Sequence, residues 1–254
     1  MQKRRRPSIA AMLLSLALLP APAAAAEIRV LSANALSIAE KALAAEFASE
    51  AGHQVSFTFG SPGQVEQRLK AGERYDLVIM PGEAAAALDR DGRWQTGSRR
   101  PLARVGIGLA VREGTHLDLS TVESTRKALL DARALTLSDS RTGGLSGPNA
   151  LKVLGKLGIS DAVKDKTVLS PNGQELIAKG EIDIGLYNVS EIPRASGVVL
   201  AGPVPRAVQV YIDYDAALPA DSAAPGLASA LLEHFSAPAA QATWHKSGLE
   251  LAGE

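Results

Sequence analysis

Short apolar runs alternate with longer amphipathic stretches along almost the whole chain. Apolar runs of a few residues are typical of buried strands, whereas apolar positions three and four residues apart are typical of helices. The pattern predicts strands at residues 28–31, 54–59, 77–80, 105–111, 134–137, 167–169 and 182–186. It predicts helices at residues 35–50, 84–88, 122–131, 148–157, 226–235 and 238–247. Such alternation indicates an α/β fold with mostly parallel sheets.

One short phrase occurs twice. Ser61-Pro62-Gly63-Gln64 precedes a predicted helix and then a strand, and Ser170-Pro171-Asn172-Gly173-Gln174 precedes the same pair of elements again. Ser followed by Pro is a typical helix start, where unpaired backbone N–H groups and the helix dipole can hold an anion. Capping alone explains either copy. The repetition predicts two similar lobes, each of which directs a helix start at a ligand.

The first 26 residues have the pattern of a secretory signal peptide. Lys3-Arg4-Arg5-Arg6 is followed by an apolar run from Ile9 to Leu19 and then by the small residues from Ala21 to Ala26. The apolar run is too short to span a membrane comfortably, and this order of segments is that of an exported protein. We expect cleavage after Ala24 or Ala26, a periplasmic location and no insertion in the membrane.

Composition narrows the classes of function. The chain has 27 basic and 27 acidic residues, and loss of the four basic residues of the signal leaves 23 against 27, a net charge of −4. Such a chain, without Lys/Arg runs, does not suit nucleic acid. The lack of Cys excludes disulfides and thiolate chemistry. The four His residues form no zinc-type pair, and no nucleotide-binding or serine-hydrolase motif is present, so we expect no metal and no cofactor.

Two apolar stretches are predicted to connect the lobes. The first spans residues 104–108, and the second runs from Gly202-Pro203-Val204-Pro205 to Ile212. Ordered apolar connections of this kind suit a hinge between rigid parts. We therefore predict a signal peptide at residues 1–26, the first part of lobe 1 at 27–103, lobe 2 at 104–207, and a return to lobe 1 with C-terminal helices at 208–254.

Several segments resemble periplasmic solute-binding proteins of the molybdate-binding type. They are residues 28–35, 52–55, 59–61, 71–79 and 235–241, so the resemblance spans nearly the whole mature chain. It implies a type II periplasmic binding protein fold, in which two α/β lobes joined by two hinge strands close on a ligand. It also implies a monomer that captures a small anion, either a molybdate-like oxyanion or an organic acid, and delivers it to an ABC permease.

The resemblance also implies part of the binding site. In that family, Ser hydroxyls and backbone amides at helix starts hold the oxyanion, together with a Tyr from the second lobe. Ser61 matches one of the Ser-bearing loops, and the other loop falls near Ser32 and Asn34. Tyr187 and Asn188 cover the region of the Tyr.

The segment 140–148 adds candidates of its own, because it is a Gly-rich loop between a predicted strand and a predicted helix. Arg141 is suited to grip a carboxylate or phosphate through two parallel hydrogen bonds, which would favour an organic acid; the alternative is an Arg paired with Asp139 or solvated. The predicted ligand-binding residues are Ser32, Asn34, Ser61, Arg141, Thr142, Ser146, Tyr187 and Asn188, with Ser170 ranked lower.

Two alternatives use the same cleft. The branch that the chain resembles includes a periplasmic aconitate isomerase, which would move an allylic proton between two carbons of a bound tricarboxylate. Tyr187, Asp139 and Glu191 are candidate bases, but none stands out by spacing, so no catalytic residue is assigned. The other alternative is a periplasmic sensor that presents its ligand to a membrane kinase.

Overall fold

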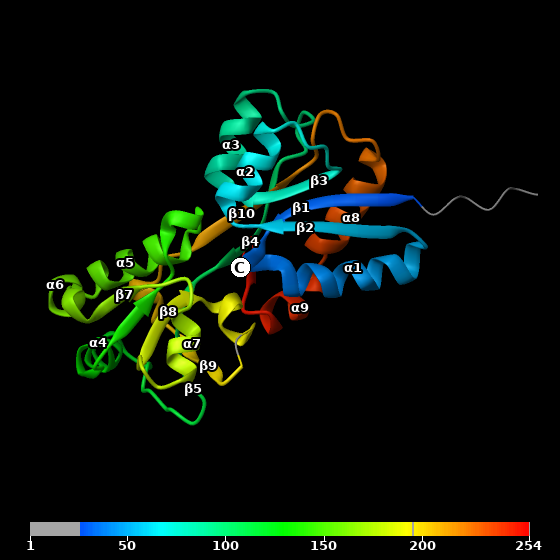
Figure 1. Cartoon of the computed structure of the whole chain (residues 1–254). Coiled ribbons are helices and arrows are strands. Elements are labelled where there is room, and N and C mark those ends of the chain that lie inside the picture. The colour runs from blue at the N-terminus through cyan, green and yellow to red at the C-terminus, as the bar shows by residue number, and fades with distance from the viewer. Residues whose placement is uncertain (1–25, 195, 254) are drawn as a thin grey trace, which may run out of the picture.

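The computed structural model describes residues 26–253 except Ala195, and it consists of two sheets with helices packed on both faces of each (Figure 1). The predicted signal peptide lies outside the described residues, apart from Ala26. We refer to each sheet with its helices as a lobe.

The first lobe contains a six-stranded sheet in the order β11-β4-β10-β3-β1-β2. Helices α1, α8 and α9 pack on one face of this sheet, and α2 and α3 pack on the other (Figure 1). The strands are β1 (Glu27–Ala33), β2 (Gln54–Gly60), β3 (Leu77–Pro81), β4 (Arg100–Val105), β10 (Ile212–Ala217) and β11 (Glu250–Leu251). The helices are α1 (Ser37–Ala51), α2 (Pro62–Lys70), α3 (Gly82–Arg90), α8 (Pro225–Ser236) and α9 (Gln241–Lys246), with short 3-10 turns η1 (Asn34–Leu36) and η6 (Pro238–Ala240).

The second lobe contains a five-stranded sheet in the order β7-β6-β8-β5-β9. Helices α4, α5 and α6 share one apolar core with this sheet, and α7 and η4 share another. The strands are β5 (Ile107–Arg112), β6 (Leu135–Leu137), β7 (Thr167–Leu169), β8 (Ile184–Asn188) and β9 (Val198–Pro203). The helices are α4 (Val122–Asp131), α5 (Ser146–Lys156), α6 (Ser160–Val163) and α7 (Gly173–Ala178), with 3-10 turns η2 (Ser140–Thr142), η3 (Lys164–Lys166), η4 (Val189–Arg194) and η5 (Arg206–Val208).

Both sheets are mixed, whereas the sequence predicted mostly parallel ones. The pairs β1–β2, β1–β3, β6–β7 and β6–β8 are parallel, as helix crossovers require. The strands that carry the chain between the lobes, β4, β5, β9 and β10, pair antiparallel with their neighbours. The strands at which the chain enters or leaves a lobe therefore run opposite to their neighbours in the sheet.

Strand β1 is buried on both faces because it lies inside the first sheet. Ile28 and Val30 pack in the core beneath α1, whereas Leu31 packs on the α2 and α3 side. The alternation of side chains along a strand places Ser32 on the same face as Val30. Its hydroxyl accordingly donates to Glu40 Oε1 in the first turn of α1, at 2.7 Å.

The chain passes between the lobes twice, and one side chain ties the two crossings together. The first crossing is Gly106 between β4 and β5, and the second runs from β9 to β10. Buried Gln209, on the second crossing, accepts from Ile107 N at 2.7 Å and donates to Ile107 O at 2.9 Å. A Cβ on Gly106 would lie 2.8 Å from the Gln209 amide, so the close approach requires glycine there. The predicted lobe boundaries lie close to these crossings and stay proposals.

The second Ser-Pro phrase does not begin a helix in the way that the first one does. Helix α2 begins at Pro62 with Ser61 as its cap, as predicted. Ser170 instead accepts from Asn172 N at 3.1 Å within a turn, and α7 begins at Gly173. The hydrogen bond to the Ser170 side chain holds residues 170–172 in a turn, and the helix therefore begins only after Pro171 and Asn172. The repeat therefore predicted the second helix but not its first residue.

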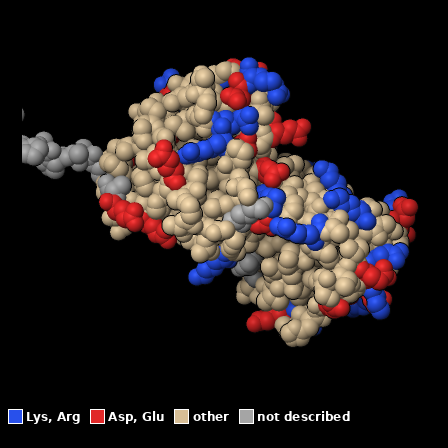
Figure 2. Space-filling model, turned by 180° about the vertical axis from the view of Figure 1, so that it is seen from behind, with Lys and Arg blue, Asp and Glu red and all other residues tan. Residues whose placement is uncertain are grey.

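Acidic and basic side chains are interspersed on the face seen in Figure 2, and neither sign forms a continuous field there. Within the described part of the chain, no helix is both long and apolar enough to cross a bilayer.

Candidate functional site

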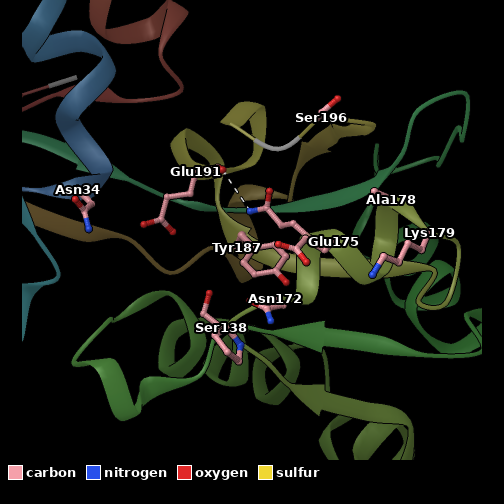
Figure 3. A pocket seen from close by; sticks show the side chains of 11 residues that line it. Asn34, Ser138, Asn172, Glu175, Ala178, Lys179, Tyr187, Glu191 and Ser196 are labelled. Carbon is pink, nitrogen blue, oxygen red and sulfur yellow. Dashed lines mark hydrogen bonds between the residues drawn. The ribbon is translucent and has the colours of Figure 1, made fainter.

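Two adjoining cavities lie where the lobes meet. The inner chamber has a volume of about 150 Å³ and receives residues from both lobes. The outer chamber, of about 790 Å³, is formed mainly by the second lobe (Figure 3). The chambers adjoin because Asn34, Ser138 and Glu191 line both. The inner chamber is lined by Ala33, Asn34, Ala35, Ser61, Pro62, Ser138, Asp139, Gly144, Leu145, Ser146, Asn188, Glu191 and Tyr214. The outer chamber is lined by Asn34, Ser138, Pro171, Asn172, Gln174, Glu175, Ala178, Lys179, Tyr187, Glu191 and Ser196.

Three helix starts meet at the inner chamber. Residues 33–35 begin the turn η1 that leads into α1, Ser61 and Pro62 begin α2, and residues 144–146 begin α5. No side chain caps the starts of η1 and α5. The first N–H groups of a helix have no partner within the helix itself. Helix dipoles add partial positive charge at the same ends. These helix starts favour a small anion, whereas the carboxylates of Asp139 and Glu191, which line the same chamber, oppose one.

Ser61 is held in place by a reciprocal pair of hydrogen bonds. Its backbone N–H donates to Gln64 Oε1 at 2.8 Å, and its hydroxyl oxygen accepts from Gln64 N at 3.3 Å. This capping box fixes the direction in which α2 enters the cleft. Just after it, Gly63 N donates to Gly143 O at 3.3 Å, which joins the start of α2 to the second lobe.

The second-lobe wall contains a buried polar atom that has no protein partner among the described residues. Ser146 Oγ accepts from Asn188 N at 3.0 Å, but Asn188 Oδ1 is buried and unpartnered. The hydroxyl of Tyr187, in the outer chamber, is also buried, and the hydroxyl of Thr136 is its hydrogen-bonding neighbour. Burial is the main cause that raises the pKa of Tyr187; the hydrogen bond with Thr136 opposes this shift, and the negative charge of Glu191 adds to it. Buried polar atoms without partners are uncommon in folded proteins, so Asn188 Oδ1 indicates a place for a ligand.

A buried carboxyl lies behind the inner chamber. Glu40 is completely buried, bonded to Ser32 through Oε1, and without a partner at Oε2. Burial raises the pKa of Glu40 to about 8, against a smaller lowering by the Ser32 hydroxyl. The nearby Tyr214, which lines the chamber, also has a raised pKa, mainly through burial and further through the charges of Glu191 and Glu40. Glu40 is therefore mostly uncharged at neutral pH.

Arg141 lines neither chamber. Its side chain is 87% exposed and bonds to Asp139 Oδ2, with Nε at 2.7 Å. Hydrogen bonds from the Arg141 side chain and backbone lower the pKa of Asp139, so the pair is ionised. The interpretation of Arg141 as a residue paired with Asp139 fits this geometry, and the interpretation as a cleft residue does not.

The structure brings together five of the eight predicted residues. Asn34, Ser61, Ser146 and Asn188 line the inner chamber, and Tyr187 lines the outer one. Ser32 is fully buried and turned toward Glu40. Arg141 is on the surface, and Thr142 belongs to η2 next to Gly143.

Sequence reasoning did not select four further polar residues of the inner lining for binding, namely Ser138, Asp139, Glu191 and Tyr214. Ser138 directly follows strand β6, and ligands commonly bind where strands end, so its position was a usable signal. Asp139 and Glu191 were considered as candidate bases. Tyr214 lies within β10 and offers no local signal, because only the return of the chain from the second lobe brings it to the site.

Comparison with known proteins agrees with this geometry. The family model described as bacterial extracellular solute-binding protein matches residues 28–250. The chain belongs to this family. An aconitate isomerase from a Pseudomonas species is 27% identical over 191 residues, which are 75% of this chain and 72% of that protein. The molybdate-binding protein ModA of Azotobacter vinelandii is 25% identical over 179 residues, 69% of each chain.

Solved structures show the same fold. The sulfate-binding protein SubI from Mycobacterium tuberculosis superposes with a TM-score of 0.70 at 17% identity, covering 90% of this chain and 88% of that one. The predicted family and the type II periplasmic binding protein fold are thus confirmed. Members of this solute-binding family are periplasmic binding proteins that typically take small anionic ligands and work with ABC transporters.

Proposed function

We propose that this protein captures a small anion in the inner chamber, in the periplasm, and delivers it as a monomer to an ABC permease. The observation that carries the proposal is the meeting of three helix starts from two lobes at one chamber of about 150 Å³. Among the described residues, no Lys or Arg lines that chamber. Backbone N–H groups, hydroxyls and helix dipoles would therefore hold the anion.

The chamber lies at the junction of the lobes, and binding would thus be coupled to closure. A ligand between Ser61 on one side and Ser146 on the other contacts both lobes only when they are close together. A ligand that makes more contacts in the closed form than in the open form shifts a two-lobed protein toward the closed form. A permease can recognise that form.

The isomerase is the second candidate, because an aconitate isomerase is among the curated relatives. Glu191 lines both chambers and is the one candidate base among the three that reaches into both. A tricarboxylate, however, would bring three negative charges to chambers whose described linings contain Asp139, Glu175 and Glu191 against Lys179, whereas a small oxyanion brings one or two. The repulsion grows with the charge of the ligand, so we rank capture above isomerisation.

A thermal-shift screen tests the proposal. The purified protein is heated with molybdate, tungstate, sulfate, phosphate, citrate or either aconitate isomer, and proton NMR follows the two aconitate samples. An anion present at a hundred times its dissociation constant should add about 2.7 kcal/mol of stability. Stabilisation without conversion supports capture. Conversion of one aconitate isomer into the other would support the isomerase, and no stabilisation by any anion would contradict the proposed function.

A further inference from the structure

The inner chamber combines helix starts, which donate hydrogen bonds, with side-chain groups that only accept them. We propose that its ligand is a compact anion that carries an O–H group, so that the ligand donates one hydrogen bond while its charged oxygens accept the others. Fully ionised oxyanions such as sulfate and molybdate lack this proton and bind more weakly. The inference rests on the proposed function, because it takes the inner chamber as the anion site.

Asn188 supplies the acceptor on which the inference depends. It ends strand β8, is 3% exposed and lines the inner chamber. Its backbone N–H donates to Ser146 Oγ at 3.0 Å, but its side-chain Oδ1 has no partner among the described residues. An amide oxygen only accepts hydrogen bonds, and a buried acceptor left unpaired is costly. A ligand O–H would satisfy this atom, whereas an unprotonated oxyanion would place a negatively charged oxygen near it.

The two carboxylates of the lining favour the same kind of ligand. Hydrogen bonds from Arg141 lower the pKa of Asp139 and keep it ionised, and burial together with the negative charge of Glu191 raises the pKa of Tyr214. Figure 3 shows the Glu191 carboxylate directed toward Asn34, which comes from the first lobe. Carboxylates repel each charged oxygen of a ligand but accept strongly from an O–H group. An anion with an O–H group can therefore turn it toward these acceptors and keep its charged oxygens away from them.

The charged oxygens of the same ligand have donors elsewhere in the lining. The chamber receives the starts of η1, α2 and α5, and the first N–H groups of a helix have no partner within that helix. Ser146 accepts from Asn188 N through Oγ, so its hydroxyl proton can serve a second acceptor. The lining thus offers both donors and acceptors, and a ligand with both kinds of group matches it.

The size of the inner chamber limits how large this ligand can be. Its volume is about 150 Å³, below the roughly 300–1,000 Å³ of most small-molecule pockets. Two compact anions carry the required proton: hydrogenphosphate has an acidic O–H group, and glycolate, a small 2-hydroxy acid, has one on carbon. Both present charged oxygens and an O–H donor, and the test separates them.

The test uses pairs of anions that differ mainly in the O–H group. Hydrogenphosphate and sulfate, compared at pH 8, are both tetrahedral and carry nearly the same charge, and glycolate differs from propionate by a hydroxyl in place of a methyl group. Dissociation constants come from titration calorimetry at one ionic strength. In the pair that binds more tightly, we expect the anion with the O–H group to bind at least about tenfold more tightly than its counterpart. A tighter phosphate pair would identify an acidic O–H group, and a tighter glycolate pair one on carbon.

Variants of Asn188 link this preference to its side-chain oxygen. Asn188→Leu has the same branched shape but no acceptor, and it should reduce the ratio within the tighter pair by about tenfold. Asn188→Asp keeps an acceptor oxygen, so it should weaken both anions through its charge and retain the ratio. Asn149→Leu is the control, because it removes a buried amide from α5 that lines neither chamber, and it should leave the ratio unchanged. Melting curves show whether the variants fold, and the wild-type pairs remain a test if Asn188→Leu does not.

The failure of this inference differs from the failure of the proposed function. If the tighter pair shows a smaller ratio or prefers the anion without the O–H group, or if only molybdate, tungstate or sulfate binds, the inference is wrong while anion capture stands. A ratio that Asn188→Leu leaves unchanged would likewise contradict the role of Asn188. If no member of the pairs or of the thermal-shift screen binds, anion capture itself is contradicted, and the O–H preference with it.

Discussion

The backbone N–H of Gly63 lies 3.3 Å from the carbonyl oxygen of Gly143, and this hydrogen bond joins the two lobes. The two glycines are packed so closely that a Cβ on Gly63 would lie 3.2 Å from Gly143 Cα. The contact lies just beyond Ser61, at the edge of the inner chamber. The lobes therefore meet directly beside the candidate anion site.

Gly63→Ala should weaken ligand binding without lowering stability. The added methyl group presses on Gly143 and holds the lobes apart, so the dissociation constant of the best anion in the screen should rise by about tenfold. Removing a glycine from a helix start reduces the entropy of the unfolded chain and is otherwise neutral or mildly stabilising. Titration calorimetry and a melting curve measure the two effects.

Gly226→Ala is the matched control. Gly226 also follows a Pro at the start of a helix, α8, but a Cβ there would meet nothing within 4 Å. Affinity should be unchanged in this variant. An equal affinity in both variants would show that the Gly63 contact does not govern closure.

Ser146→Ala should destabilise the second lobe. The Ser146 hydroxyl is the acceptor for the buried backbone N–H of Asn188, and its loss leaves that donor unpaired at a cost of about 1–3 kcal/mol. The shift in the urea denaturation midpoint measures this cost. Ser160→Ala, at the exposed start of α6, serves as control. A loss of affinity with unchanged stability would instead assign Ser146 to ligand contact alone.

The fold was largely predictable from hydrophobic periodicity. Helix α4 and strand β7 have the predicted bounds, because each is a single amphipathic or apolar segment between clear breaks. The prediction of one strand at 105–111 was wrong, since Gly106 divides this run between β4 of one sheet and β5 of the other. Periodicity alone reports burial, and both halves are buried, so it does not place the break, although Gly106 lies within the stretch 104–108 that was predicted to connect the lobes.

The site was less predictable than the fold. Asn34, Ser61, Ser146, Tyr187 and Asn188 adjoin the ends of elements, where helix-start and strand-end chemistry is visible in the sequence. Ser32 lines neither chamber, because adjacent residues of β1 face opposite sides of the sheet. Its side chain lies on the interior face, where its hydroxyl donates to Glu40. Glu40 itself stands among apolar positions of α1, at the spacing of Leu36 and Leu43, so periodicity could have identified a buried acid.

Glu40→Gln should change how stability depends on pH. The pKa of Glu40 is about 8 when folded and 4.5 as a reference value, so the folded protein binds an extra proton between these values. Its contribution to stability is present below about pH 4.5 and is lost as pH rises through 8. The unfolding free energy of the wild type should therefore fall relative to the variant by about 1.4 kcal/mol per pH unit, on the order of 3 kcal/mol from pH 5 to pH 8.

Urea denaturation at pH 5, 6.5 and 8 measures this difference. The control Glu50→Gln removes an exposed carboxylate from the same helix and should follow the wild type. Parallel stability curves for the wild type and Glu40→Gln would show that Glu40 titrates near its ordinary value.

Arg141→Ala should leave ligand affinity within about twofold of the wild type. The side chain is exposed and paired with Asp139, and exposed ion pairs contribute little. Asp139 accepts from the backbone N–H of Arg141 as well, which the variant retains. A loss of tenfold or more, measured by titration calorimetry, would return Arg141 to the binding site and favour an organic acid gripped by its guanidinium.

A crystal structure of the protein with the panel anion that gives the largest thermal shift tests the central claim most directly. The account predicts that the oxyanion lies in the inner chamber, within hydrogen-bonding distance of groups at the start of η1 or α2 in the first lobe and at the start of α5 in the second. An anion that contacts only one lobe, or that binds outside the inner chamber, would contradict it.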